Sequence, residues 1–83
     1  MPVVFRHGSW RLQFYSNEGS PREPAHIHAL RDGKDAKFWL WPEVHLAYND
    51  GLSATEIGAI AKVIAERRDE IQRKWNDFFG DAD

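Results

Sequence analysis

The 83-residue sequence contains no cysteine. Disulfide bonds, thiolate metal ligands and a cysteine nucleophile are therefore excluded. The absence of cysteine also fits a reducing compartment, and we expect a cytoplasmic protein. The first residues agree with this expectation, because Arg6 places a charge too early for the apolar run of a secretory signal.

Long apolar runs and an excess of positive charge are also missing. No stretch approaches the roughly 20 apolar residues that a membrane-spanning helix requires, so we expect no membrane association. The chain has 11 Lys and Arg against 13 Asp and Glu, which gives a net charge of −2. Affinity for nucleic acids depends strongly on clustered positive charge, so this balance argues against direct binding of DNA or RNA.

Aromatic residues, by contrast, are abundant, with 4 Trp, 5 Phe and 2 Tyr. Each aromatic side chain can bury roughly 150–250 Å². A chain of this length can therefore build one packed core without disulfide bonds, but not two. We expect a single domain over residues 1–83, with strands over roughly residues 3–49 and a helical segment over roughly residues 54–79.

The N-terminal half predicts short antiparallel strands, because apolar and polar residues alternate with a period of two. Two strands on either side of Gly8 and Ser9 predict a hairpin. The polar residues between its apolar positions are expected to face solvent. The residues of the second strand that should face the core are Trp10, Leu12 and Phe14.

Two more strands are predicted over Ala25–Leu30 and Ala36–Trp41, with a turn at Asp32 and Gly33 between them. Residues 43–49 fit either a fifth strand or a helical turn. Residues 16–24 are predicted to form a loop, because they contain two prolines and other turn-forming residues. The sheet therefore has four or five short strands.

The clearest element is the C-terminal helical segment. Ser53 and Glu56 form the pattern of a capping box at its start. A continuous helix over residues 54–79 would be roughly 39 Å long, whereas a domain of this size has a radius of gyration of about 12 Å. The helix either breaks near Arg67 and Arg68 or extends outward to meet a partner, and we favour the break. The apolar stripe with helical spacing comprises Ile57, Ile60, Ala61, Ile64, Ile71, Trp75, Phe78 and Phe79.

These patterns together predict an α+β fold. A small antiparallel sheet is followed by a long, broken amphipathic helix that packs on one face of the sheet. The exposed face of the helix carries charged residues. Four basic residues are expected to lie there in solvent, and they are Arg67, Arg68, Arg73 and Lys74.

One cluster of residues has the elements of a chemical site. His26 and His28 are separated by one residue in a predicted strand, so they project from the same face, and Glu23 lies just upstream. Two imidazoles and a carboxylate are a known ligand set for a divalent transition metal, which can activate water. The alternatives are metal-free acid–base catalysis and a structural role. In the structural interpretation, which we favour, Ile27 and Ala29 face the core and the histidines face solvent or bond to loop backbone.

Four segments, taken in order, resemble a known family. They are Phe14–Gly19, Glu23–His28, Ala36–Leu40 and Arg68–Trp75. This set resembles the bacterial family called domain of unknown function 4160. Its most specific pattern, Glu-Pro-Pro-His-x-His, is matched at Glu23, Pro24, His26 and His28, with Ala25 in place of the second proline.

The resemblance implies a small prokaryotic cytoplasmic protein. Members of this family are often encoded beside another small protein and have been proposed as parts of toxin–antitoxin-like pairs. A protein partner is therefore implied, with RNA as a further target of such a pair. No catalytic residues can be carried over from the family.

Two functions stay open at this point. The first is a protein-interaction module, such as one component of a toxin–antitoxin-like pair, that contacts a small protein partner or a second copy of itself. Its contact surface is predicted at the segment Glu23–His28 or at Ile71, Trp75, Phe78 and Phe79. The alternative is a metal-dependent hydrolase, for example a ribonuclease, that uses His26 and His28 with Glu23 as ligand or general base.

Overall fold

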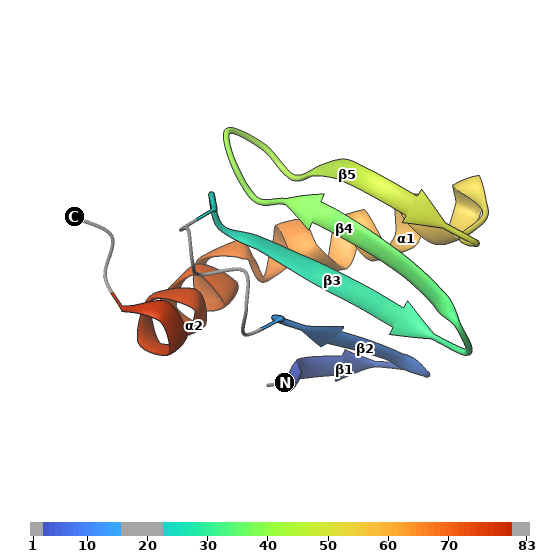
Figure 1. The fold of residues 1–83 in the computed structure, drawn as a ribbon. Coiled ribbons are helices and arrows are strands. Elements are labelled where there is room, and N and C mark those ends of the chain that lie inside the picture. Colours follow the sequence, from blue (N-terminus) through green and yellow to red (C-terminus); the bar gives the residue numbers. More distant parts are fainter. Residues whose placement is uncertain (1–2, 16–22, 81–83) are drawn as a thin grey trace.

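The computed structural model describes residues 3–15 and 23–80 and contains, in this part of the chain, a five-stranded antiparallel sheet followed by two helices (Figure 1). The strands are β1 (Val3–His7), β2 (Trp10–Gln13), β3 (His26–Arg31), β4 (Lys34–Trp39) and β5 (His45–Asp50). The helices are α1 (Ala54–Glu66) and α2 (Arg68–Phe79). The strands lie side by side in chain order, and both helices cover one face of the sheet. The predicted α+β fold is confirmed.

Tight turns join the consecutive strands β1–β2 and β3–β4. Gly8 has a φ of 58°, and Asp32 and Gly33 have φ values of 49° and 80°. Two successive residues with positive φ are the requirement of the type I′ hairpin turn. Because this turn is so short, pairing resumes at once between Arg31 and Lys34, and β4 begins two residues earlier than predicted.

The segment that fitted either a strand or a helical turn is a strand, β5. It pairs with β4 along the edge of the sheet, and most of its residues are exposed. Asn49 then closes the turn that leads to α1. Its amide donates to the Leu52 carbonyl at 3.0 Å, and its Oδ1 accepts from the Leu52 backbone N–H at 2.9 Å.

The two edge strands share an irregularity. In β1 the register shifts by one residue around Val4, and in β5 it shifts by one residue around Ala47. An extra residue of this kind, a β-bulge, bends the strand and disturbs its pattern of backbone hydrogen bonds. Both edges of the sheet are therefore poor templates for pairing with another strand.

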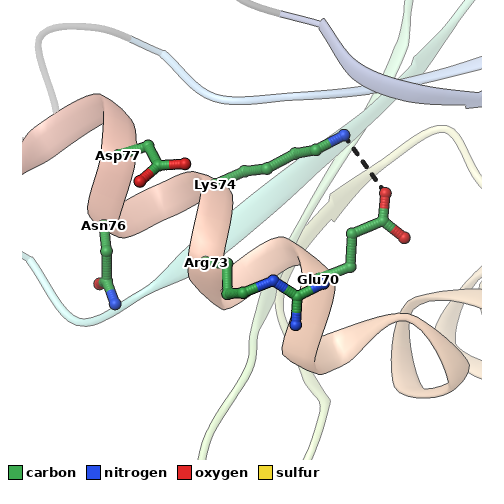
Figure 2. A pocket seen from close by; sticks show the side chains of 5 residues that line it. All are labelled: Glu70, Arg73, Lys74, Asn76 and Asp77. Atoms are coloured by element: carbon green, nitrogen blue, oxygen red, sulfur yellow. Dashed lines mark ion pairs between the residues drawn. The ribbon is translucent and has the colours of Figure 1, made fainter.

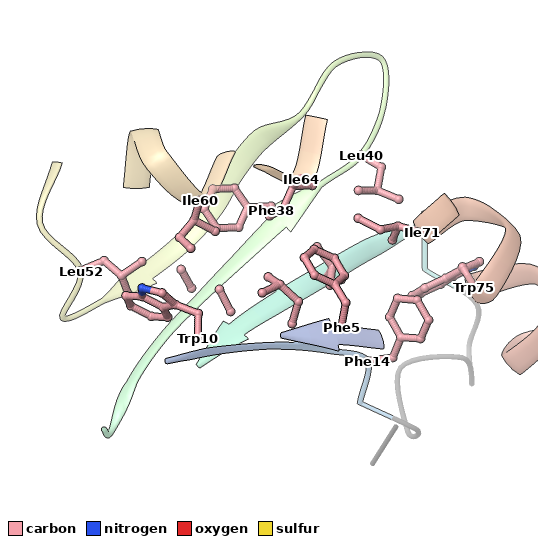
Figure 3. Packing of buried hydrophobic residues seen from close by; sticks show 14 residues of the cluster. Phe5, Trp10, Phe14, Phe38, Leu40, Leu52, Ile60, Ile64, Ile71 and Trp75 are labelled. Atoms are coloured by element: carbon pink, nitrogen blue, oxygen red, sulfur yellow. The ribbon is translucent and has the colours of Figure 1, made fainter. Parts of the chain in front are cut away.

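The core fills the space between the sheet and the two helices. Figure 3 shows it running from Leu52 and Trp10 at one end to Phe14 and Trp75 at the other. Trp10, Leu12 and Phe14 are buried, as the alternation predicts. The remaining buried apolar residues among those described are Phe5, Ile27, Ala29, Ala36, Phe38, Leu40, Ile60, Ile64 and Ile71.

The helical segment is interrupted once. Arg67 separates α1 from α2 and adopts a φ of −114° and a ψ of 18°, which ends the first helix. Its guanidinium lies 3.8 Å from the ring centre of Phe5 and forms an ion pair with Glu70. The radius of gyration is 11.9 Å, close to the value that made a continuous helix unfavourable. The predicted break is confirmed.

The start of α1 is tied both to itself and to the sheet. The predicted capping box is present, with Ser53 and Glu56 each accepting a hydrogen bond from the other's backbone N–H at 3.1 and 2.9 Å. The Glu56 carboxylate also accepts from Arg31 at 2.6 Å and lies 3.4 Å from the Lys34 ammonium. The bond from the Ser53 backbone, with the nearby charges of Lys34 and Arg31, lowers the pKa of Glu56 below 4.5.

Candidate functional site

His26 and His28 lie on β3 and alternate with Ile27 and Ala29, which face the helices. The prediction that the two imidazoles share the opposite face follows from this alternation. The prediction that they face solvent is wrong, because both side chains are fully buried. Aromatic residues from other parts of the chain cover them, and each histidine has its own set of neighbours.

His26 is held by the loop backbone and by two tryptophans. Its Nδ1 lies 2.8 Å from the Pro24 carbonyl oxygen, and because a carbonyl can only accept, Nδ1 carries the hydrogen. The ring centres of Trp39 and Trp75 lie 5.3 and 4.9 Å away. The Glu23 carboxylate is 3.9 Å from the same Nδ1. This environment is the hydrogen-bonded, structural arrangement that the sequence allowed.

His28 belongs to a second group of polar side chains. Its ring stacks on Tyr15 with centres 3.9 Å apart. Its Nδ1 lies 3.5 Å from Asp35 Oδ1 and 3.4 Å from the Tyr48 hydroxyl, which donates to Asp35 Oδ2 at 2.9 Å. Asp35 and Tyr48 therefore lie beside Nδ1 of the buried imidazole, while the Tyr15 ring packs on its face.

These groups are part of a row that crosses the sheet, which we call the polar row. Its members stand opposite one another on β2, β3, β4 and β5, and they are Gln13, His28, Lys37 and Tyr48. Gln13 was expected to face solvent but is only 5% exposed. The Lys37 ammonium donates to Glu23 at 2.8 Å and lies 4.4 Å from the ring centre of Trp39. Sequence periodicity could not reveal this row, because it depends on the register of four strands.

The structure does not bring Glu23, His26 and His28 together as a three-ligand metal site. Within residues 3–15 and 23–80, no three His, Cys, Asp or Glu side chains are grouped closely enough to hold a metal ion. The two imidazole planes are nearly perpendicular, at 80°, and Glu23 binds Lys37 instead. The other two histidines, His7 and His45, are exposed.

The predicted apolar interface on the helix is divided by the fold. Ile71 and Trp75 are 0% and 3% exposed and belong to the core, so they are not available at the surface. Phe78 is 43% exposed, and Phe79 is partly buried. Both rings pack on the buried ring of Phe14, and their ring centres lie 6.2 and 6.0 Å from its centre. The exposed part of the predicted surface is therefore limited to Phe78 and an edge of Phe79.

A second exposed aromatic residue, Trp41, borders a pocket of about 380 Å³ that we call the Trp41 pocket. Trp41 is 45% exposed although it is held on two sides. Its Nε1 donates to Gln72 at 2.7 Å, and the Arg68 guanidinium lies 4.0 Å from its ring centre. The described residues that line the pocket are Glu23, Pro24, Ala25, Trp41, Gln72, Trp75 and Asn76.

Arg68 anchors this part of the surface. Its guanidinium reaches the carbonyl oxygens of Leu40 and Pro42, both at 3.4 Å, in addition to the ring of Trp41. The expectation of a solvated helix face is wrong for Arg67 and Arg68, because each packs on an aromatic ring from another part of the chain. Alkyl and guanidinium surfaces of arginine pack readily on such rings. Arg73 and Lys74 are exposed, as expected.

The outer side of α2 carries a polar hollow of about 370 Å³. Figure 2 shows its five side chains, which are Glu70, Arg73, Lys74, Asn76 and Asp77. Glu70 pairs with Lys74 at 3.2 Å, and hydrogen bonds from Arg67 and Lys74 lower the pKa of its carboxyl group. The hollow is a charged helix surface whose groups are already paired in part.

Comparison with known proteins identifies the family. No helix in the described part of the chain is both long enough and apolar enough to cross a membrane. No curated protein and no solved structure matches the chain. The family model described as domain of unknown function (DUF4160) matches residues 9–76, which include the polar row and the whole lining of the Trp41 pocket. The chain therefore belongs to the DUF4160 family.

Proposed function

We propose that this domain is a protein-interaction module that binds a small protein partner, as one component of a toxin–antitoxin-like pair in the bacterial cytoplasm. The observation that carries the proposal is the exposed but fixed ring of Trp41. Trp41 has 45% of its surface in solvent, whereas Trp10 and Trp75 are buried. Its hydrogen bond to Gln72 and its contact with Arg68 keep it in one orientation.

An ordered, exposed tryptophan has the properties of a binding hot spot. Trp, Tyr and Arg dominate the energetics of protein interfaces, and they act most strongly beside a pocket that excludes water. Because the Trp41 ring is already held in place, this side chain loses little conformational entropy when a partner packs against it. Phe78 is another exposed aromatic residue. It lies on α2, the helix that supplies Gln72.

The alternative proposal is a metal-dependent hydrolase that uses His26 and His28. The geometry favours it less. Both imidazoles are buried, the Nδ1 atom of His26 is engaged by a backbone carbonyl, and Glu23 is paired with Lys37. A substrate or metal would need access to side chains that the surrounding aromatic rings cover.

The test is binding to the protein encoded by the neighbouring gene, measured by isothermal titration calorimetry. Trp41→Ala should weaken binding by about 30-fold, because truncating a hot-spot residue costs about 2 kcal/mol. The matched control is Leu46→Ala, since Leu46 is 38% exposed and lies on β5, away from the pocket lining. Its effect should be less than about twofold.

Two outcomes would contradict the proposal. One is a wild-type chain that does not bind its neighbour. The other is binding that is equally sensitive to Leu46→Ala and Trp41→Ala, which would place the contact elsewhere. Light scattering on the chain alone would show whether it instead pairs with a second copy of itself.

A further inference from the structure

We infer that the Trp41 pocket receives an arginine side chain of the partner protein, whose guanidinium pairs with Glu23. This inference rests on the proposed function and names the chemistry of the contact. Among the described residues that line the pocket, Glu23 carries the one ionisable side chain, and 37% of that side chain is exposed. Glu23 is therefore the group in this lining that can form an ion pair with a ligand, and its ion-pair partner would be a cation.

Lys37 does not use up the binding capacity of this carboxylate. Its ammonium donates to Glu23 Oε1 at 2.8 Å. A carboxylate has two oxygens and several acceptor positions, so one carboxylate can serve two cations when they approach from different sides. Lys37 is 9% exposed, whereas 37% of the Glu23 side chain is exposed, so part of Glu23 remains open to a ligand.

The rest of the pocket suits the stem and the plane of an arginine. Pro24 and Ala25 supply apolar contacts for the three methylene groups, and Trp41 supplies an aromatic ring for the guanidinium. Arg68 already shows that this ring accepts a guanidinium at 4.0 Å, and 45% of Trp41 is still exposed.

Arginine fits better than lysine because the pocket offers more than one acceptor. Gln72 Nε2 donates to Asn76 Oδ1 at 2.9 Å, and that oxygen keeps a second lone pair for a further donor. A guanidinium carries several N–H groups in a planar fork and can bond both Glu23 and Asn76, whereas an ammonium is a compact point charge. The net charge of −2 also favours encounter with a basic partner.

The experiment uses the full chain and a small probe, N-acetyl-L-arginine methylamide. Binding is followed by ¹H–¹⁵N NMR at the Trp41 indole N–H and the Gln72 side-chain amide. We expect saturable shifts at both groups with millimolar affinity. N-acetyl-L-norleucine methylamide, which has an apolar stem and no charge, should bind up to about fivefold more weakly, since an exposed ion pair contributes up to about 1 kcal/mol.

The variant Glu23→Gln should weaken the arginine probe by about fivefold, and glutamine retains an acceptor for Lys37. The matched control is Glu66→Gln, since Glu66 is exposed on α1 and does not line the pocket. Unchanged spectra elsewhere in the chain would show that both variants fold.

Equal binding of the norleucine and arginine probes, or arginine binding that is insensitive to Glu23→Gln, would overturn the inference. The two proposals can fail separately. A partner whose binding depends on Trp41 but not on Glu23 would overturn the arginine contact and keep the interaction function. A chain that binds the arginine probe but not the protein encoded by the neighbouring gene would overturn the interaction function and keep the arginine-binding pocket.

Discussion

At the scale of single residues, His26 is a packing side chain with one fixed hydrogen bond. Its imidazole is buried between Trp39 and Trp75 and donates to the Pro24 carbonyl oxygen. Removing it would leave a cavity beside two large rings and would take the hydrogen-bond donor away from the Pro24 carbonyl oxygen. Both effects reduce the free energy of unfolding.

We therefore expect His26→Ala to lower the free energy of unfolding by about 2–3 kcal/mol. Urea denaturation followed by tryptophan fluorescence measures this quantity. The control is His7→Ala, because His7 is exposed, and its effect should stay within about 0.5 kcal/mol. If His26→Ala instead keeps its full stability, the imidazole has a role other than packing and the hydrolase hypothesis gains support.

Part of the environment of the histidines could be predicted from the sequence. Alternation along β3 places Ile27 and Ala29 in the core and both histidines on the other face. It could not predict their burial, because the residues that cover them, such as Tyr15 and Trp75, are distant in the sequence. Local periodicity reports which face a side chain takes, but not what covers that face.

At the scale of elements, Glu56 joins the first turn of α1 to the β3–β4 hairpin. It completes the capping box and accepts from Arg31 of β3. Its lowered pKa means that the folded state holds the carboxylate more strongly in its ionised form than the unfolded chain does. This contribution to stability is present above the unfolded pKa of about 4.3 and is lost as the pH falls through the lower folded value.

Glu56→Gln should therefore reduce the melting temperature at pH 7 and reduce its dependence on pH below about 4.5, since the neutral side chain cannot release this stability on acidification. Thermal unfolding from pH 3 to pH 7 by circular dichroism tests this expectation. Glu66→Gln, at the other end of α1, is the control and should follow the wild-type curve. A Glu56→Gln curve parallel to that of the wild type would show that the carboxylate is not a source of the acid sensitivity.

The elements themselves were largely predictable, and the failures have local causes. The hairpin at Gly8, the start of α1 at Ser53 and the break at Arg67 follow from turn residues, capping chemistry and helix length. The start of β4 was placed two residues late, because a two-residue turn lets pairing resume at Lys34. The polar row and the Trp41 pocket were not predictable, because they form only when β4, the segment after it and α2 are packed together.

At the scale of the whole molecule, the arrangement of donors makes a prediction about metal content. In the described ranges, 3–15 and 23–80, three potential ligands do not gather at one point. Elemental analysis of tag-free protein after incubation with zinc, manganese or iron should therefore find well under one equivalent of bound metal. The hydrolase proposal requires the opposite result, which is near-stoichiometric metal that a His28→Ala variant loses while it remains folded.

The irregular edge strands have a consequence for association between copies of the chain. A regular exposed edge would let one sheet recruit the next into fibrils. The β-bulges at Val4 and Ala47 interrupt that growth at both edges of the sheet. Mutations that alter the α2 surface can then accumulate with little risk that the sheet itself begins to aggregate.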